Sequence, residues 1–575
     1  MSRREKRKDP APAVTAEPRA PWTIYAAIVA VALLSSITGI ANGFAQDDAA
    51  IIAQDSRLHD LSLWRDVFSQ PYWPPPYVTD LYRPLASLLL AVQYAMGSGA
   101  PMAFRIVSYL LYAASAVAVF HLARRLMPRG IAVGIALLFA AHPVHVEAVA
   151  LAVAQNELLV TTIVAASVGL YLVRRRASGG ALATRDWALL SAAGAVAALS
   201  KEQGFLLPTF LVIAELCLVE RDSLRTRFGE VGWGFFALAG VALAVLMIRY
   251  RVLGQQTVSV APAEALIGKT FLGRLVTMWR IAPDWLRLLV WPAHLRFDYS
   301  PQEFVGAKRI GVHEILGLLL LLSVIAAAVV ARRRAPVVTF GLSWLGLALL
   351  PVSNVFVATG ILIGERTLFL PSVGWLIALG GAVAFYLESR PALAGRAGRG
   401  LAVATGILVC LGIARSAMRH PVWHDNNSLT LAAMAESPSS WRAHANYAEL
   451  MYDRGNAAVG RAEFERAIQL APSPWWVRNA FARRLRAVGN DSGAVEQLRN
   501  SLTQYPDQVD AVSELVAALI ATGSYKEALG IANNIIVTEN APPIMMALHQ
   551  VADSALAAHA PPGSVRVTVP TRRQQ

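Results

Sequence analysis

Long apolar runs constrain the fold of this 575-residue chain more than any other feature. A helix of about 20 mostly apolar residues can cross the hydrocarbon core of a bilayer. The sequence therefore predicts an all-α, polytopic membrane domain with about eleven transmembrane helices. The first run is too long for a signal peptide and lacks a cleavage signature, so we interpret it as an anchor. The predicted spans are residues 22–43, 102–123, 130–149, 157–173, 187–200, 204–219, 231–249, 310–331, 335–353, 367–387 and 400–418.

The composition agrees with a chain that lies mostly in lipid. It is 55% hydrophobic and 16% charged, whereas a soluble protein carries about 25% charged residues. The only cysteines, Cys217 and Cys410, lie in apolar runs, which excludes a disulfide scaffold and a cysteine-based metal site. Arginine outnumbers lysine and alanine is abundant, which indicates a GC-rich bacterial genome.

The net charge of +14 comes from short basic clusters between the apolar runs. Such clusters mark the cytoplasmic side of a membrane protein, whereas nucleic-acid binding, which needs one continuous basic face, is not expected. We expect the chain to lie in the plasma (inner) membrane. The basic clusters then place residues 1–21 in the cytoplasm. Residues 44–101, 250–309 and everything after about 420 then lie outside. The clusters are Arg3–Lys8, Arg124–Arg129, Arg174–Arg176, Arg221–Arg227, Arg332–Arg334 and Arg390–Arg399.

Glycines at intervals of 34 residues mark a repeat in the C-terminal part of the chain, at Gly455, Gly489 and Gly523. This period, with a helix on each side of the glycine turn, is typical of tetratricopeptide repeats, which stack into an α-solenoid. Three units are the usual minimum for a stable stack. The alternative is an ordinary helical bundle with coincidental spacing. Pro472, Pro506 and Asn540 keep the same spacing, and the units are 441–474, 475–508 and 509–542.

These patterns divide the chain into five parts. The C-terminal tail from Pro561 is polar and contains proline, so we expect it to be disordered. The parts are a basic N-terminus (1–21), a membrane domain (22–420), a linker (421–440), the three repeats (441–542) and a terminal helix with its tail (543–575).

Varied ionisable residues collect at the predicted outer side, whereas the inner side carries mainly arginine. Ionisable groups near lipid are costly and are usually functional. We therefore expect a chemical site at the outer membrane face. The residues are Asp47, Asp48, His142, His145, Glu147, Glu157, Lys201, Glu202, Asp298, Glu365 and Arg366.

Asp47 and Asp48 directly follow the first span. One carboxylate there could deprotonate a hydroxyl nucleophile while its neighbour orients it or holds a metal ion. The pair could equally cap a helix. Arg83, next to a proline at the predicted bilayer surface, could bind a phosphate with two hydrogen bonds. Taken alone, a snorkelling arginine on an interfacial helix is the better interpretation of Arg83.

The segment HPVHVEAV brings together His142, His145 and Glu147. The HExxH spacing of zinc sites is absent, so the rim of an active site is favoured over a zinc centre. A polar cluster that fixes a helix turn after Pro143 is the structural alternative.

Two further charged pairs lie in short outer turns, Lys201 with Glu202 and Glu365 with Arg366. Each pair could instead be a solvated ion pair, which contributes less than about 1 kcal/mol when exposed.

The order of these motifs is more specific than any one of them. DDAAI, LYRPL, HPVHVEAV with QNELL, SKEQG, LRFDYS and PVSNVFVATGILIGERTLFLPSVGW follow one another, and WRAHANYAEL then opens the repeats. This arrangement resembles the transmembrane and tetratricopeptide-repeat O-mannosyltransferase family, within the C-type glycosyltransferase superfamily. The resemblance covers about residues 44 to 540.

The resemblance implies inverting transfer of a sugar from a polyprenyl-phosphate donor to a serine or threonine hydroxyl at the outer face. It implies a protein acceptor presented by the repeats, membrane lipids as surroundings, and no obligatory cofactor. Asp47 matches the first acid of the family's acidic pair, as the candidate base, and Asp48 the second. The candidate phosphate ligands are Arg83, Lys201 and Arg366, the candidate rim residues are His142, His145, Glu147, Glu202 and Glu365, and any divalent cation would bind Asp47, Asp48 and Glu147.

Three alternatives stay open. The same chemistry could act on a lipid or glycan acceptor. The chain could be a non-catalytic scaffold whose repeats organise an envelope complex. A lipid or polysaccharide transporter would be expected to contain internal repeats among its spans, and the sequence contains none that we recognise.

Overall fold

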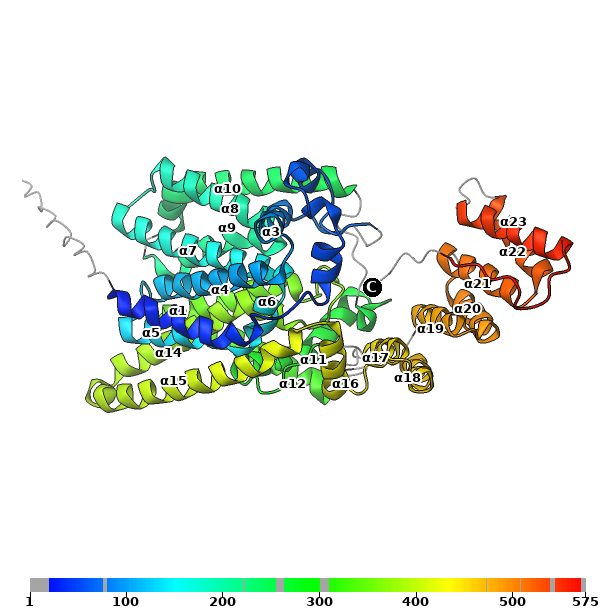
Figure 1. Ribbon diagram of the computed structural model, residues 1–575. Helices are drawn as coiled ribbons and strands as arrows, with labels where there is room; N and C mark the ends of the chain where they lie inside the picture. Colours follow the sequence, from blue (N-terminus) through cyan, green and yellow to red (C-terminus); the bar gives the residue numbers. More distant parts are fainter. Residues whose placement is uncertain are drawn as a thin grey trace, which may run out of the picture.

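The computed structural model describes residues 20–75, 80–220, 223–254, 263–299, 310–471, 473–506, 508–537 and 543–569. These residues form helices and loops and no strand, which confirms the all-α class. Figure 1 shows a bundle of long helices, from which a row of shorter helices extends at one end through α16 (Asn426–Glu436). Four features of the sequence lie outside the described residues: the basic residues before position 20, Arg221, Pro472 and Asn540.

Seven helices of the described residues are long and apolar enough to cross a membrane. A bent pair, α5 (Arg129–Ala140) with Pro143–Ala150, turns by 46° and would make an eighth. The bend lies at Pro143, which cannot continue the hydrogen-bond ladder of a helix. A multi-pass membrane protein is confirmed. The seven spans are built on α1 (Trp22–Ser36), α4 (Pro101–Ala123), α7 (Gln155–Ser178), α10 (Leu224–Leu253), α12 (Val312–Ala331), α14 (Phe369–Ser389) and α15 (Pro391–Arg419).

The three remaining predicted spans are helices, but short ones: α8 (Thr184–Ser200), α9 (Leu207–Leu218) and α13 (Pro336–Leu349). At 1.5 Å per residue α9 is only about 18 Å long, against a hydrocarbon core of about 30 Å. The number of eleven spans therefore stays a prediction. Two helices occupy predicted outer loops, α3 (Pro84–Gly97) and α11 (Phe271–Val290).

The short helices of the membrane domain lie mostly at its loops. They are η1 (Ile37–Gly39), η2 (Ala49–Ala53), η3 (Ser56–Leu58), η4 (Leu61–Leu63), α2 (Trp64–Ser69), η5 (Pro143–His145), α6 (Val146–Ala150), η6 (Ala152–Ala154), η7 (Glu202–Leu206), η9 (Glu264–Leu266), η10 (Leu350–Val352), η11 (Glu365–Leu368) and η12 (His420–Trp423).

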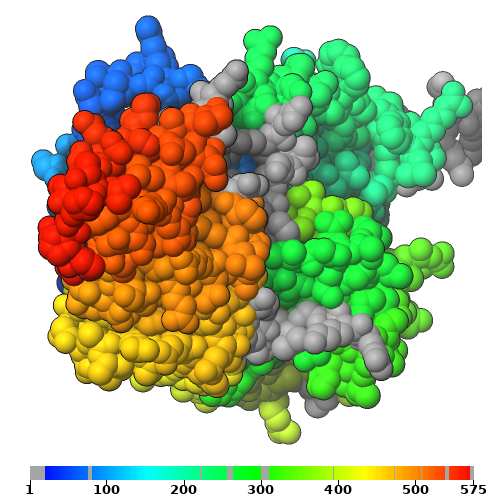
Figure 2. Space-filling view, turned by 90° about the vertical axis from the view of Figure 1, so that its right-hand side faces the viewer, coloured from blue at the N-terminus to red at the C-terminus, as the bar shows by residue number. Residues whose placement is uncertain are grey.

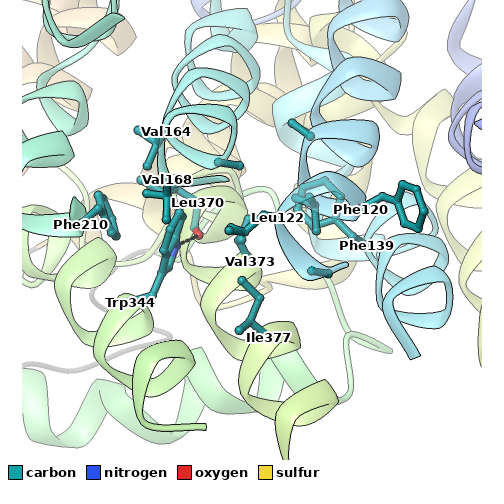
Figure 3. Close-up of a cluster of buried hydrophobic side chains, with 14 of the residues drawn as sticks. Phe120, Leu122, Phe139, Val164, Val168, Phe210, Trp344, Leu370, Val373 and Ile377 are labelled. Atoms are coloured by element: carbon teal, nitrogen blue, oxygen red, sulfur yellow. Dashed lines mark hydrogen bonds between the residues drawn. The ribbon is translucent and has the colours of Figure 1, made fainter. Parts of the chain in front are cut away.

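The core of the bundle is built around Trp344 of α13 (Figure 3). Its indole N–H donates to the carbonyl of Leu370 at 3.0 Å, and its ring lies 4.3 Å from that of Phe210. Glycines bring α13 and α14 together, because a Cβ on Gly341 would meet the backbone nitrogen of Ala378 at 2.4 Å. Small residues at such contacts are typical of helix packing in membranes.

The C-terminal part contains three helix pairs with the predicted period. The glycine after the first helix of each pair has a positive φ, 77° at Gly455, 85° at Gly489 and 81° at Gly523, a conformation that glycine adopts without strain. The tetratricopeptide assignment itself stays a prediction. The pairs are α17 (Trp441–Asp453) with α18 (Ala457–Leu470), α19 (Trp475–Ala487) with α20 (Asp491–Gln504), and α21 (Val509–Ala521) with α22 (Tyr525–Ile536). A single helix, α23 (Pro543–Ala557), follows them.

The described residues of the tail, from Pro561 to Val569, contact the helical repeats. The amide of Gly563 donates to the carbonyl of Ala521 at 2.9 Å, and Arg566 pairs with Asp491 at 3.1 Å. Polar and proline-rich composition indicates only the lack of an apolar core, whereas this segment is held by backbone and ionic partners on the repeats. The predicted linker, 421–440, also contains a helix, α16.

Candidate active site

The ionisable residues expected at the outer face lie at one end of the bundle. Asp48 pairs at 3.2 Å with Arg105 near the start of α4, and Glu157 near the start of α7 bonds Lys201 just after α8. Arg124 follows the other end of α4, which has 23 residues and is therefore about 35 Å long. The ionisable residues of both signs therefore lie at one end of the bundle, and the arginine clusters lie at the opposite end.

This separation leads to a topological prediction. A green fluorescent protein fused after Arg334 should fluoresce, and an alkaline phosphatase fused after Trp423 should be active, because the first site would be cytoplasmic and the second outside. Exchanging the two reporters at each site is the control. Fluorescence from the fusion after Trp423 would contradict the predicted orientation and would place the repeats inside.

Asp47 lies beside Arg366, which also contacts Glu147. The guanidinium of Arg366 donates to Oδ2 of Asp47 at 2.9 Å, and its backbone amide donates to Oε2 of Glu147 at 2.9 Å. The Asp47 side chain keeps 24% of its surface exposed. A carboxylate that is both held in place and accessible can meet a substrate hydroxyl.

Asp48 occupies a different environment from its neighbour. It is fully buried, and its carboxylate accepts hydrogen bonds from the backbone amides of Ala152 (3.0 Å) and Val153 (2.9 Å) as well as from Arg105. Burial raises the pKa of Asp48, while Arg105 and the two amides oppose this rise. Asp48 therefore fixes the loop after α1 to the start of α7, and it does not share an accessible site with Asp47.

Arg83 is paired with Glu202 at 2.6 Å, and Arg249 contacts the same carboxylate at 3.0 Å. The Arg83 guanidinium also lies 5.3 Å from the centre of the Tyr72 ring. Although burial disfavours the charged form of Glu202, the two guanidinium groups, Arg83 foremost, lower the pKa of Glu202 to about 2. A snorkelling role for Arg83 is therefore not what the structure shows. Arg249 also donates to the backbone carbonyl of Asp80 at 2.7 Å.

Lys201 bonds Glu157, whose side chain is 1% exposed. Burial lowers the pKa of Lys201, and Glu157 opposes this effect. The ion pairs form three groups, and Lys201 lies close enough to Arg83 and Arg366 of the other two for their charges to act on it, so we treat them as one cluster of alternating sign. Its cations are Arg83, Lys201, Arg249 and Arg366, and its anions are Asp47, Glu147, Glu157 and Glu202.

The two histidines do not form the predicted rim of this cluster. His145 is 1% exposed, and its ring nitrogens contact the hydroxyls of Tyr112 (3.2 Å) and Ser372 (2.9 Å). His142 accepts from the amide of Val144 at 3.3 Å, and its other ring nitrogen contacts the carbonyl of Leu289 at 3.0 Å. Both residues fix the break between α5 and α6, which is the structural alternative considered for this segment.

Glu365 is buried next to the cluster rather than on its rim. Its Oε1 accepts hydrogen bonds from the backbone amide of Arg296 at 2.6 Å and from the hydroxyl of Tyr299 at 2.7 Å. Burial and the neighbouring Glu365 raise the pKa of Tyr299, so its hydroxyl remains a donor. Glu365 thus binds the predicted outer loop that precedes α12.

The described residues contain no group of three or more histidine, cysteine or acidic side chains placed to hold a metal ion. The predicted cation ligands Asp47, Asp48 and Glu147 are separated by their partners, since Asp48 bonds Arg105 whereas the other two bond Arg366.

Sequence reasoning missed several members of the cluster. Arg249 ends a long apolar run that the sequence assigns to a span, although an arginine at that position, followed by Arg251, is a usable signal. Glu157 is among the ionisable residues expected at the outer face, but the sequence assigns it no role in the site. Arg105 and Tyr72 stand alone in their segments, and nothing in the sequence pairs them with Asp48 or Arg83.

Comparisons with known proteins show what the chain resembles. The dolichyl-phosphate-mannose-protein mannosyltransferase family matches residues 80–248, the stretch that supplies much of the cluster. The human protein O-mannosyl-transferase TMTC4 is 26% identical over 492 residues, which cover 76% of this chain. The chain is thus similar in sequence to protein O-mannosyltransferases. It spans less than two thirds of such relatives, 65% of the human protein. A Drosophila melanogaster relative, Tmtc2, is 31% identical over 274 residues, which cover 45% of this chain and 28% of that protein.

Solved structures of an archaeal oligosaccharyltransferase from Archaeoglobus fulgidus are also similar. The one in complex with an inhibitory peptide and a dolichol-phosphate has a TM-score of 0.37 and 14% sequence identity. The alignment covers 80% of this chain and 63% of that protein.

Proposed function

We propose that this chain is a membrane glycosyltransferase. It transfers a sugar from a polyprenyl-phosphate donor to a serine or threonine hydroxyl of a protein, at the outer face of a plasma (inner) membrane. The observation that carries the proposal is the pairing of an accessible carboxylate, Asp47, with Arg366 at 2.9 Å, in a region with three other cations that are at most 14% exposed. The relationship to protein O-mannosyltransferases supports the reaction class.

In the proposed reaction, the acceptor oxygen attacks the anomeric carbon of the sugar. The bond from that carbon to the phosphate oxygen breaks, and Asp47 takes the hydroxyl proton. Arg366 holds the carboxylate of Asp47 in place through its hydrogen bond. Because attack and departure occur on opposite faces, the configuration at the anomeric carbon inverts.

The leaving phosphate is proposed to lie against Lys201, Arg83 and Arg366. Cations that are fixed before the reaction stabilise the negative charge that develops on the leaving group. Each of the three is held in place by a carboxylate, Glu157, Glu202 or Asp47. The polyprenyl chain would remain in the surrounding lipid, which explains why the sequence needs no glycine-rich nucleotide loop.

The helical repeats are proposed to present the protein acceptor. The indole N–H of Trp441, the first residue of α17, donates to Glu264 of the outer loop at 2.9 Å. Figure 2 views the molecule from the end that carries the repeats. The repeats, coloured yellow to red, cover one side of this end and lie next to segments of the membrane domain coloured green. Stacked helix pairs form a concave surface suited to an extended peptide.

The direct test uses the purified full chain in lipid nanodiscs. A radiolabelled polyprenyl-phosphate mannose is supplied with a serine- and threonine-containing peptide, and label on the peptide is measured. Transfer to the peptide supports the proposal. Transfer only to lipid or glycan would support the same chemistry with another acceptor. Absence of transfer with every lipid-phosphate sugar and acceptor would contradict the proposal and favour a scaffold.

Removal of residues 441–575 tests the role of the repeats, because the cut lies directly before α17 and removes all helix pairs together. We expect the KM for the peptide to rise by about tenfold or more, the loss expected when a docking surface is removed. The Kd for the lipid donor should change less than twofold. Donor affinity in the same preparation is the folding control, and equal loss of both affinities would argue against presentation.

A further inference from the structure

A segment of four residues, Arg296 to Tyr299, contacts the membrane domain and the root of the repeats at the same time. On the membrane side, the amide of Arg296 and the hydroxyl of Tyr299 both donate to Oε1 of Glu365, at 2.6 and 2.7 Å. Glu365 is 1% exposed, so water does not compete for these bonds. This side of the segment is firmly fixed.

On the repeat side, the residues between them make the contacts. The amide of Phe297 donates to Oε2 of Glu436 at 3.0 Å, at the end of α16. The Ser437 hydroxyl donates to the carbonyl of Asp298 at 2.8 Å, and the Ser440 hydroxyl donates to the Asp298 carboxylate. Ser440 in turn caps α17, the first helix of the repeats, by accepting from the amide of Ala443. Glu436, Ser437 and Ser440 are called the repeat root below.

The membrane side of this segment leads directly to the proposed base. Glu365 and Arg366 are neighbours in η11, a single short helical turn. Arg366 is fixed by its amide bond to Glu147 and holds Asp47 through its guanidinium. A displacement of the repeat root would therefore reach Asp47 through the segment Arg296–Tyr299, then Glu365, and then Arg366.

We infer that the segment Arg296–Tyr299 sets the position of Asp47 according to the position of the repeats, with Tyr299 and Glu365 as positioning residues. This inference rests on the proposed function. A peptide seated in the repeats would hold the root in place, and the segment would hold Arg366 and Asp47 at the acceptor hydroxyl. Small displacements of a catalytic group cost large factors in rate, so the effect belongs to turnover rather than to affinity.

The test is Tyr299→Phe, which removes one hydroxyl and keeps the ring. We expect kcat for peptide transfer to fall by roughly tenfold or more, while the peptide KM and the Kd for polyprenyl-phosphate mannose change less than twofold. The matched control is Tyr171→Phe. The Tyr171 hydroxyl donates to a buried carboxylate, Glu215, at 2.8 Å, but near the basic end of the bundle. That variant should keep the wild-type kcat.

Asp298 supplies a second test from the repeat side. Asp298→Ala should lower kcat as Tyr299→Phe does, and Asp298→Asn should restore most of it, because an amide oxygen still accepts from Ser440. An unchanged kcat in folded Tyr299→Phe would overturn the inference while wild-type transfer upholds the proposed function. An equal loss in Tyr171→Phe would overturn it too, since the effect would then be general destabilisation. A wild-type protein that transfers no sugar would overturn both.

Discussion

Replacing Asp47 by asparagine should lower kcat by about 100-fold or more, the scale of general-base catalysis. The amide keeps the size of the side chain and can still accept the hydrogen bond from Arg366, which is now 2.9 Å long. It cannot take the proton of the acceptor hydroxyl. The Kd for polyprenyl-phosphate mannose should change less than twofold. Single-turnover kinetics with saturating donor, together with a donor-binding titration, separate the two quantities.

Asp48→Asn is the matched control for this prediction, one residue away. Asp48 is buried against Arg105, and breaking a buried ion pair costs about 3–5 kcal/mol of stability. We therefore expect a lower Tm, with kcat near the wild-type value at temperatures where the variant is folded. Normal turnover of Asp47→Asn would eliminate that residue as the base. A folded Asp48→Asn without turnover would assign the chemistry to the buried acid instead.

Replacing Arg83 by alanine should weaken binding of the lipid donor by about 10- to 100-fold, the loss expected for one charge-assisted hydrogen bond. Turnover should fall as well, because the same cation is proposed to stabilise the leaving phosphate. Fluorescence titration of the donor into nanodisc-embedded protein gives the affinity. Unchanged donor affinity would show that Arg83 does not bind the donor and that its role is limited to the ion pair with Glu202.

Glu202→Gln separates those two roles. It removes the carboxylate that pairs with Arg83 at 2.6 Å and with Arg249 at 3.0 Å, so both cations become more available to a phosphate. Donor affinity should hold or increase although Tm falls. If the pair is merely structural, Arg83→Ala and Glu202→Gln should lower Tm alike and leave donor affinity unchanged.

Much of the fold and the end of the bundle that holds the site could be predicted from the sequence. Apolar length locates spans such as α4 and α10 because the bilayer requires a minimum helix length. Charge asymmetry assigns Asp47, Glu147, Lys201 and the other mixed charges to one end, where the structure places them together.

The contacts within that end could not be predicted in the same way. Sequence position tells which end of a helix a residue occupies, but not its rotation about the helix axis. For this reason Asp48 and His145, close to accessible residues in sequence, are buried in the structure. Arg249 was hidden because its single charge hardly changes the mean hydropathy of a 30-residue helix. The order of the tail to residue 569 depends on partners more than 70 positions away, such as Asp491.

The anomeric configuration of the glycosylated peptide tests the central claim most directly. Purified full chain is incubated with polyprenyl-phosphate mannose of known configuration and a serine-containing peptide, and the product is analysed by nuclear magnetic resonance. Direct displacement with Asp47 as base predicts one polyprenyl phosphate released for each sugar transferred and an inverted anomeric carbon. A retained configuration, or the same product formed at the wild-type rate by Asp47→Asn, would contradict the account.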